Sequence, residues 1–135
     1  MDFNVMAKPA SVAAATAAGY VLGAIWYAPP VFGNRWMAAL GRTREQRGSP
    51  ARAMTLTLIT CLISAWVLAV ILTRAGVGSA LGGAVAGLGV GLGVYGLNIY
   101  SDSLFAGSSL RLISIQAGYR ALQYALMGAI LGAWR

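Results

Sequence analysis

The chain has 135 residues, of which 59% are hydrophobic and 10% charged, and its ten basic and three acidic residues give a net charge of +7. Ordinary soluble domains contain about 25% charged residues, so this composition argues against a soluble protein and favours a single membrane domain. With no histidine and one cysteine, Cys61, the chain cannot form an intrachain disulfide, an imidazole-ligated metal site or a histidine-based catalytic site.

Four long apolar stretches predict an all-α, polytopic membrane protein. Each is close to the roughly 20 residues that a helix needs to cross a hydrocarbon core of about 30 Å. The first stretch ends at Pro29 and Pro30, because proline lacks a backbone donor and disfavours helix in the residue before it. The predicted spans are residues 10–28, 53–73, 77–101 and 112–134, with a short interfacial helix at residues 31–41.

An aromatic elbow follows the first predicted span. Phe32, Trp36 and Met37 recur at helical spacing, and Trp26, Tyr27 and Trp36 are suited to the headgroup level of a bilayer. We interpret the elbow as an interfacial anchor; the alternative is a re-entrant flap that gates the polar network around Arg120 from the cytoplasmic side. The elbow residues are Trp26, Tyr27, Pro29, Phe32, Gly33 and Trp36.

Positive charge is concentrated around the first loop. Because cytoplasmic loops of membrane proteins are enriched in Lys and Arg, we expect the segment Arg35–Arg52 to be cytoplasmic and both termini to be external, in a bacterial inner membrane. This clustering needs no nucleic-acid partner. The arginines concerned are Arg35, Arg42, Arg44, Arg47 and Arg52.

Glycines spaced by four line the third predicted span. Such small faces let helix backbones approach closely in lipid, which predicts that this helix is central to the bundle or to an oligomer seam. Gly91, Gly93 and Gly96 also match a dinucleotide-binding pattern, but that pattern requires a strand-to-helix turn and not an apolar span. The packing glycines are Gly83, Gly87, Gly89, Gly91 and Gly93.

Arg120 lies inside the fourth predicted span, where an arginine costs at least about 2.5–3.5 kcal/mol on insertion scales. If the last two spans form an antiparallel hairpin, Arg120 reaches Asn98 and leans toward Asp102. Three interpretations are open: the polar network only fixes helix register, Arg120 extends toward water, or the network forms a cavity for an ion, an anionic headgroup or a small solute. The candidate network comprises Arg120, Gln116, Gln123, Asn98, Asp102 and Tyr95.

Two blocks of sequence resemble the domain of unknown function 1761 family. The first is Val21–Trp36, VLGAIWYAPPVFGNRW, and the second combines Gln116–Tyr119 with Met127–Gly132. The resemblance covers nearly the whole chain and implies a small, mainly bacterial, four-helix membrane protein without an assigned reaction. The family often has serine at the position of Ala28 and asparagine at the position of Gln116.

No catalytic constellation is evident, so we expect a non-catalytic protein that has no cofactor. The leading hypothesis is helix association, as a homo-oligomer or as an accessory subunit of a membrane complex, with membrane lipids as the other partners. The alternative is a small transporter or channel-like protein with a polar site around Arg120. A lipid- or pigment-contacting role is a third possibility.

Overall fold

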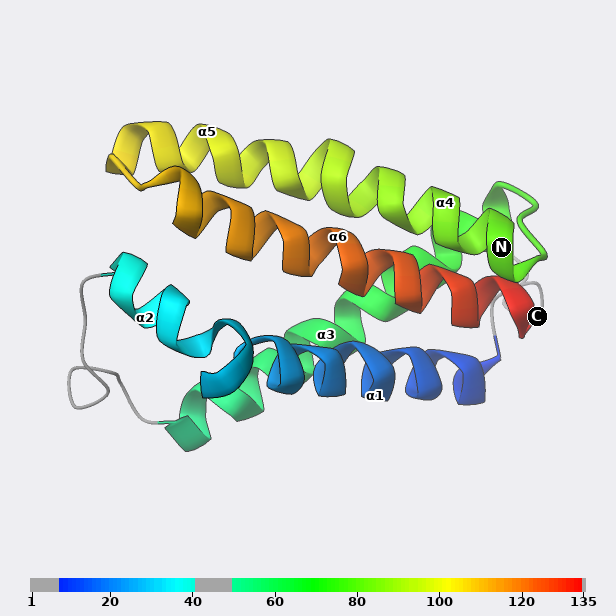
Figure 1. Ribbon diagram of the computed structural model, residues 1–135. Coiled ribbons are helices and arrows are strands. Elements are labelled where there is room, and N and C mark those ends of the chain that lie inside the picture. The colour runs from blue at the N-terminus through cyan, green and yellow to red at the C-terminus, as the bar shows by residue number, and fades with distance from the viewer. Residues whose placement is uncertain (1–7, 41–49, 135) are drawn as a thin grey trace.

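The computed structural model describes residues 8–40 and 50–134, and all regular secondary structure in these two stretches is helical. Long helices alternate in direction, so that the first begins and the last ends at the same end of the bundle (Figure 1). In chain order the elements are α1 (Pro9–Trp26), the π-helical turn η2 (Pro29–Gly33), α2 (Asn34–Leu40), α3 (Pro50–Arg74), α4 (Ala80–Val90), the π-helical turn η4 (Gly91–Gly96), α5 (Leu97–Ala106) and α6 (Leu110–Ala133).

The predicted all-α class is confirmed, and three helices in the described part of the chain are long and apolar enough to cross a membrane. They are Pro9–Trp26, Ala51–Arg74 and Ala80–Ala106, the last being α4, η4 and α5 in one continuous helix. α6 is 24 residues long but is not among them. Gln116, Arg120 and Gln123 lower its average apolarity, so its composition does not confirm the predicted fourth span.

The short segment after α1 begins earlier than predicted. The chain leaves α1 at Tyr27, turns through η2 and enters α2 at Asn34, whereas the sequence predicted one helix over residues 31–41. A Cβ atom on Gly33 would lie 2.9 Å from the carbonyl carbon of Ala28, and closer still to the carbonyl oxygen of Tyr27. Glycine is therefore required for this tight turn. Residues 41–49, which include most of the predicted arginine-rich loop, lie outside the described residues.

Three of the five predicted packing glycines bring α4 and η4 against α6. A Cβ atom on Gly83, Gly87 or Gly91 would overlap the carbonyl groups of Gly128, Tyr124 and Arg120 respectively. Backbones this close gain dispersion contacts that larger side chains would prevent. Gly89 and Gly93 differ, because an added Cβ would meet no atom within 4 Å. The close packing is thus within the chain, and the other two glycines have no packing role in it.

The hydrophobic core occupies the half of the bundle remote from α2. It contains Ala15 and Val12 from α1, Met127 and Leu131 from α6, and one face of the second half of α3. The buried residues of that face are Cys61, Ala65, Leu68, Ala69 and Leu72. By contrast, every residue from Ala51 to Thr60 in the first half of α3 is exposed. The bundle is therefore closed at one end and open at the end where α2 lies.

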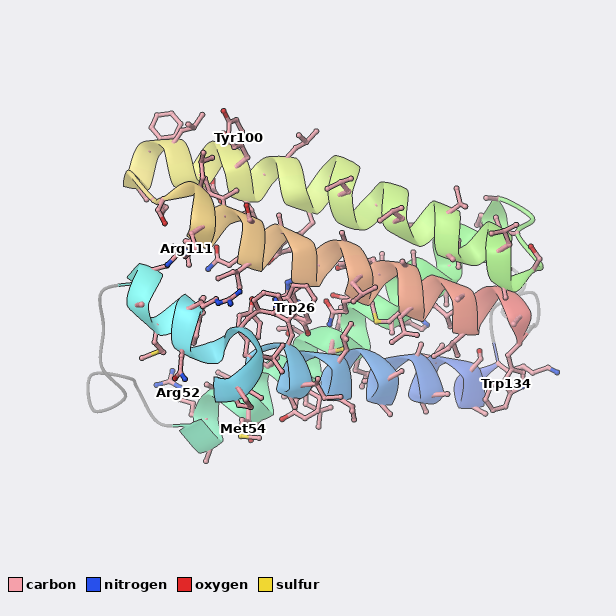
Figure 2. All side chains as sticks on the ribbon, viewed as in Figure 1. Trp26, Arg52, Met54, Tyr100, Arg111 and Trp134 are labelled. Carbon is pink, nitrogen blue, oxygen red and sulfur yellow. The ribbon has the colours of Figure 1, made fainter. Side chains whose placement is uncertain are left out.

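Large apolar side chains cover the outside of the bundle. Leu56, Ile59 and Ile63 on α3 and Leu81 and Val85 on α4 are all at least 45% exposed. Soluble monomers rarely expose apolar patches of such extent, whereas lipid-facing helices do. Arg52 and Arg111 lie at the α2 end of the bundle and Trp134 lies at the other (Figure 2).

Candidate functional site

Arg120 is held by an amide and by two aromatic rings. Its Nη1 donates a 2.8 Å hydrogen bond to Oε1 of Gln123 one turn further along α6. Its guanidinium carbon lies 5.0 Å from the centroid of the Tyr95 ring and 4.9 Å from that of Tyr119. A guanidinium over an aromatic face is stabilised by about 0.5–2 kcal/mol, the upper end applying away from water. These contacts offset part of the cost of placing the charge inside the bundle.

Gln123 connects α6 to α1 and α3. Its side chain is only 2% exposed, and its Nε2 donates to Oη of Tyr119 at 2.9 Å and to Sγ of Cys61 at 3.6 Å. Tyr119 in turn donates to the carbonyl oxygen of Gly19 at 3.3 Å, and the Cys61 thiol donates to that of Thr16 at 3.5 Å. Both polar atoms of the buried amide are thus bonded, as a buried amide requires.

The structure brings together only part of the predicted polar network. Tyr95, Gln116 and Gln123 lie with Arg120 as expected, through the contacts above or around a common pocket. Asn98 is exposed, and its Nδ2 donates to the carbonyl oxygen of Val94, four residues earlier on the same continuous helix, at 2.7 Å. Asp102 is also exposed, and among the described residues it forms no ion pair with Arg120. The predicted reach of Arg120 to Asn98 and Asp102 is therefore wrong.

The π-helical turn η4 explains this difference. Buried positions on this helix follow a spacing of four at Gly83, Gly87 and Gly91, and then a spacing of five to Gly96, with Ser103 buried one heptad later. One extra residue turns the following face by about 100°, since an α-helix has 3.6 residues per turn. In a regular α-helix, Asn98 and Asp102 would have continued the glycine face. The extra residue moves both to the exposed side.

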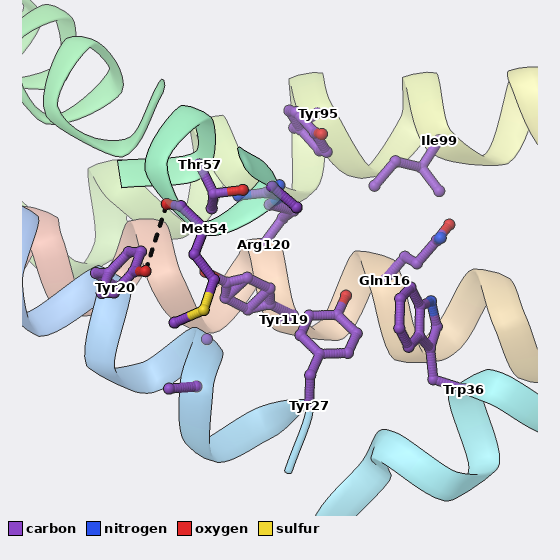
Figure 3. Close-up of a pocket in the computed structure, with 13 residues that line it drawn as sticks. Tyr20, Tyr27, Trp36, Met54, Thr57, Tyr95, Ile99, Gln116, Tyr119 and Arg120 are labelled. Carbon is purple, nitrogen blue, oxygen red and sulfur yellow. Dashed lines mark hydrogen bonds between the residues drawn. The ribbon is translucent and has the colours of Figure 1, made fainter. Parts of the chain in front are cut away.

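A pocket of about 480 Å³ adjoins Arg120 at the open end of the bundle. Figure 3 shows Tyr27, Tyr95, Gln116 and Trp36 arranged around it with Arg120 at its edge. The volume is within the range of about 300–1,000 Å³ that is usual for small-molecule sites. Its lining residues are Tyr20, Gly23, Ala24, Tyr27, Trp36, Ala53, Met54, Thr57, Tyr95, Ile99, Gln116, Tyr119 and Arg120.

The aromatic elbow is folded against α6. Trp26 donates from Nε1 to the carbonyl oxygen of Ile115 at 3.1 Å and packs on Phe32 with ring centroids 4.5 Å apart. Tyr27 meets both Trp36 and Tyr119 edge to face, at 5.0 and 5.3 Å. The elbow thus forms one wall of the pocket, a role that the interpretation as an interfacial anchor did not include.

Two polar groups of the elbow bear on the chemistry of the pocket. Burial raises the pKa of Tyr27 to about 12, although the positive charge of Arg120 acts in the opposite direction. The phenol therefore keeps its proton at neutral pH and can donate it in a hydrogen bond. Nε1 of Trp36 is buried and has no hydrogen-bond partner among the described residues, which costs about 1–3 kcal/mol for a neutral donor.

Sequence reasoning missed Tyr119 and Cys61, and it placed Trp36 at the site only through the alternative of a re-entrant flap. Tyr119 precedes Gln123 by four residues and could have been placed beside it by helical spacing. Cys61 and Trp36 belong to other helices, and no local spacing connects them to Arg120. Within the described part of the chain, no group of Cys, Asp and Glu side chains could hold a metal ion.

Comparison with known proteins gives a family and no function. No curated protein and no solved structure matches the chain. One family, described as a protein of unknown function (DUF1761), matches residues 10–132 and so covers both the elbow and the Arg120 site. The chain therefore belongs to the DUF1761 family.

Proposed function

We propose that this protein is a non-catalytic membrane protein whose pocket binds a ligand that carries an anionic group. The observation that supports this is a pocket of about 480 Å³ bordered by the guanidinium of Arg120, to which no described carboxylate is paired. Asp102 is the one acidic side chain in residues 8–40 and 50–134, and it is exposed on α5. A guanidinium has five N–H donors, of which the bond to Gln123 uses one.

The electrostatics of this end of the bundle favour an anion. A charge in a low-dielectric environment is costly unless it is paired and hydrogen-bonded, and the amide and the aromatic rings offset only part of that cost. Trp36 offers an N–H that has no partner in residues 8–40 and 50–134, and Tyr27 offers a protonated phenol in the same pocket. An oxyanion that accepts from these donors and from Arg120 would complete the site, which is the arrangement expected of a binding pocket.

The proposal includes four membrane crossings, with α6 as the fourth. Tyr119 and Gln123 are buried and Arg120 is half-buried, so the polar residues of α6 are turned toward the other helices. Its 24 residues correspond to about 36 Å, enough to span a bilayer core. By the distribution of arginines, the α2 end of the bundle faces the cytoplasm of a bacterial cell and the termini are external.

Association remains a second role that the chain could combine with binding. α6 covers the helix face that contains Gly83, Gly87 and Gly91. A contact with a second copy or with another subunit therefore has to use another face. Gly89 and Gly93 lie on such a face, open within 4 Å. This moves the association hypothesis away from the glycines that first suggested it.

Ligand-dependent stability tests the binding proposal. The protein is purified in an uncharged detergent, and its thermal unfolding is followed with benzoate, a soluble monoanion, and with laurate, an amphiphilic one. A ligand at 100 times its dissociation constant stabilises the folded state by about 2.7 kcal/mol. We expect at least one of the two anions to stabilise the natural protein. Arg120→Gln should abolish the effect.

Arg74→Gln is the matched control, because Arg74 is an exposed arginine at the far end of α3. It should keep the full ligand-induced shift. If neither anion stabilises the natural protein, or if Arg120→Gln responds as strongly as Arg74→Gln, the pocket is not an anion site and the proposal is wrong.

A further inference from the structure

We infer that the ligand is a monoanionic amphiphile, with a carboxylate or phosphodiester head and an apolar tail, which enters sideways from the bilayer between α3 and α5. This inference rests on the proposed binding function and adds to it the charge of the ligand, its tail and its route. Three features of the pocket support it: its single charge, its lateral opening and its depth along the helices.

The pocket offers compensation for one negative charge. Among the described residues that line the pocket, Arg120 is the one with a charge, and the other donors of the pocket, such as the Trp36 indole and the Tyr27 phenol, are neutral. A dianion such as a phosphomonoester would leave one charge uncompensated in a low-dielectric site, which is strongly unfavourable. Carboxylates and phosphodiesters carry a single charge and accept several hydrogen bonds, as this set of donors requires.

The side of the pocket between α3 and α5 is open. Met54 and Thr57 of α3 form one lip, and Tyr95 of η4 and Ile99 of α5 form the other (Figure 3). Residues 51–60 of α3 and Tyr95 are all exposed, and Cys61 is the first buried residue of α3 after them. In a bilayer, such an opening between two apolar helices faces lipid, and an apolar tail can lie in it without leaving the hydrocarbon.

The depth of the pocket suits a headgroup drawn slightly below the bilayer surface. Thr57 is seven residues from the start of α3, and Ile99 is seven residues from the end of α5. At 1.5 Å per residue, both lie about 10 Å from the α2 end of the bundle. An anionic head at that depth is close to Arg120, while its tail continues toward the middle of the bilayer. A fully soluble anion would have no partner for the apolar lips.

Bromine quenching of tryptophan fluorescence tests this inference, because Trp36 lines the pocket. The protein is placed in nanodiscs of uncharged phosphatidylcholine and titrated with 2-bromododecanoate, whose bromine is next to the head that Trp36 would contact, with its methyl ester, or with soluble 4-bromobenzoate. A fourth titration replaces part of the lipid with brominated phosphatidylglycerol, a phosphodiester lipid. We expect saturable quenching by the acid that is absent with the ester. Trp36→Phe should remove this component, and Arg120→Gln should weaken it at least about tenfold.

The titrations with anionic compounds distinguish the source of the ligand. Saturation by brominated phosphatidylglycerol identifies a bilayer lipid, and saturation by the fatty acid alone identifies a free amphiphile; both outcomes support the inference. If the ester quenches as saturably as the acid, or if no amphiphile saturates, the inference is wrong. If 4-bromobenzoate alone saturates, the inference fails while the proposed anion site stands.

A substitution at the lip tests the route. Thr57→Phe narrows the opening, and Leu62→Phe adds the same ring at an exposed position of α3 outside the pocket. We expect Thr57→Phe to weaken the binding of 2-bromododecanoate by at least about tenfold, and Leu62→Phe to leave it unchanged. Helix content by circular dichroism identifies a misfolded variant, in which case the comparison of acid and ester in the natural protein decides. Unchanged binding by a folded Thr57→Phe variant would refute lateral entry.

Discussion

Gly87 and Gly89 are two residues apart on α4, and the same substitution should have opposite effects at the two positions. A Cβ atom on Gly87 would overlap the carbonyl oxygen of Tyr124 and lie 3.3 Å from Cα of Ala125. Because these are backbone atoms, the clash can be relieved only if α4 and α6 move apart. A Cβ atom on Gly89 would meet nothing within 4 Å.

The magnitudes follow from packing and helix propensity. Overpacking a tight contact typically costs about 1–3 kcal/mol, and separating α4 from α6 also loosens the contacts at Gly83 and Gly91, so the upper half of that range is expected for Gly87→Ala. Alanine stabilises the interior of a helix by about 0.5–1 kcal/mol relative to glycine, and at Gly89 this is the whole expected effect. Because alanine gains the same helix propensity at Gly87 and at Gly89, the two variants should differ by the overpacking cost alone, about 2–3 kcal/mol in the free energy of unfolding.

Unfolding of the protein in mixed micelles, by titration with a denaturing detergent and with tryptophan fluorescence as the signal, measures this difference. The oligomeric state of each variant is determined in parallel in the mild detergent. If Gly87→Ala is as stable as Gly89→Ala, the close packing of α4 on α6 is wrong. If Gly87→Ala instead changes the oligomeric state without changing unfolding, the glycine face lies between chains and not within one.

Three further changes test the polar site and the elbow. Gln123→Leu removes a buried amide that is hydrogen-bonded to Arg120, Tyr119 and the Cys61 thiol. The free energy of unfolding in the same assay should therefore fall by about 2–4 kcal/mol. An unchanged value would mean that the amide is not part of the network. Gly33→Ala places a Cβ against the backbone of the preceding turn and should destabilise the elbow by about 1–3 kcal/mol, seen as altered tryptophan emission. Tyr27 should ionise near pH 12, above its usual 10.0, so the stability that its neutral form contributes is complete below pH 10 and lost as the pH rises through 12. The near-ultraviolet tyrosinate absorbance of the natural protein minus that of Tyr27→Phe gives this pKa, and a difference that titrates at pH 10 would contradict the burial of the phenol.

Sequence predicted the helices well because apolar length and proline are local signals. The predicted spans and the observed helices agree within a few residues at most ends, as the start of α1 at Pro9 and the end of α3 at Arg74 illustrate. The glycine spacing also identified the face at Gly83, Gly87 and Gly91 that contacts α6. It did not separate these from Gly89 and Gly93, because spacing gives the faces of a helix and not which face is covered.

The candidate site was predicted only in part, because its geometry depends on one extra residue and on a remote segment. The π-helical turn η4 has no signature that a count of helical spacing detects, and it moved Asn98 and Asp102 away from α6. Trp36 reaches the pocket because η2 and α2 fold back onto α6, a tertiary contact that local sequence does not specify. Arg120 and Gln123, by contrast, are one turn apart on a single helix, so helical spacing was enough to predict that their side chains lie together.

The modest apolarity of α6 follows from its place in the bundle. A hydropathy average counts all faces of a helix equally, whereas only the faces that meet lipid have to be apolar. α6 packs on α4 through glycines, on α1 through Gly19 and Met127, and on the elbow through Ile115, so the other helices cover much of its surface. A helix surrounded in this way can carry two amides and a guanidinium whose cost the Gln123 amide and two aromatic rings offset in part. Two of the polar residues that lower its apolarity, Gln116 and Arg120, also line the pocket, so the position of α6 among the other helices accounts for both properties.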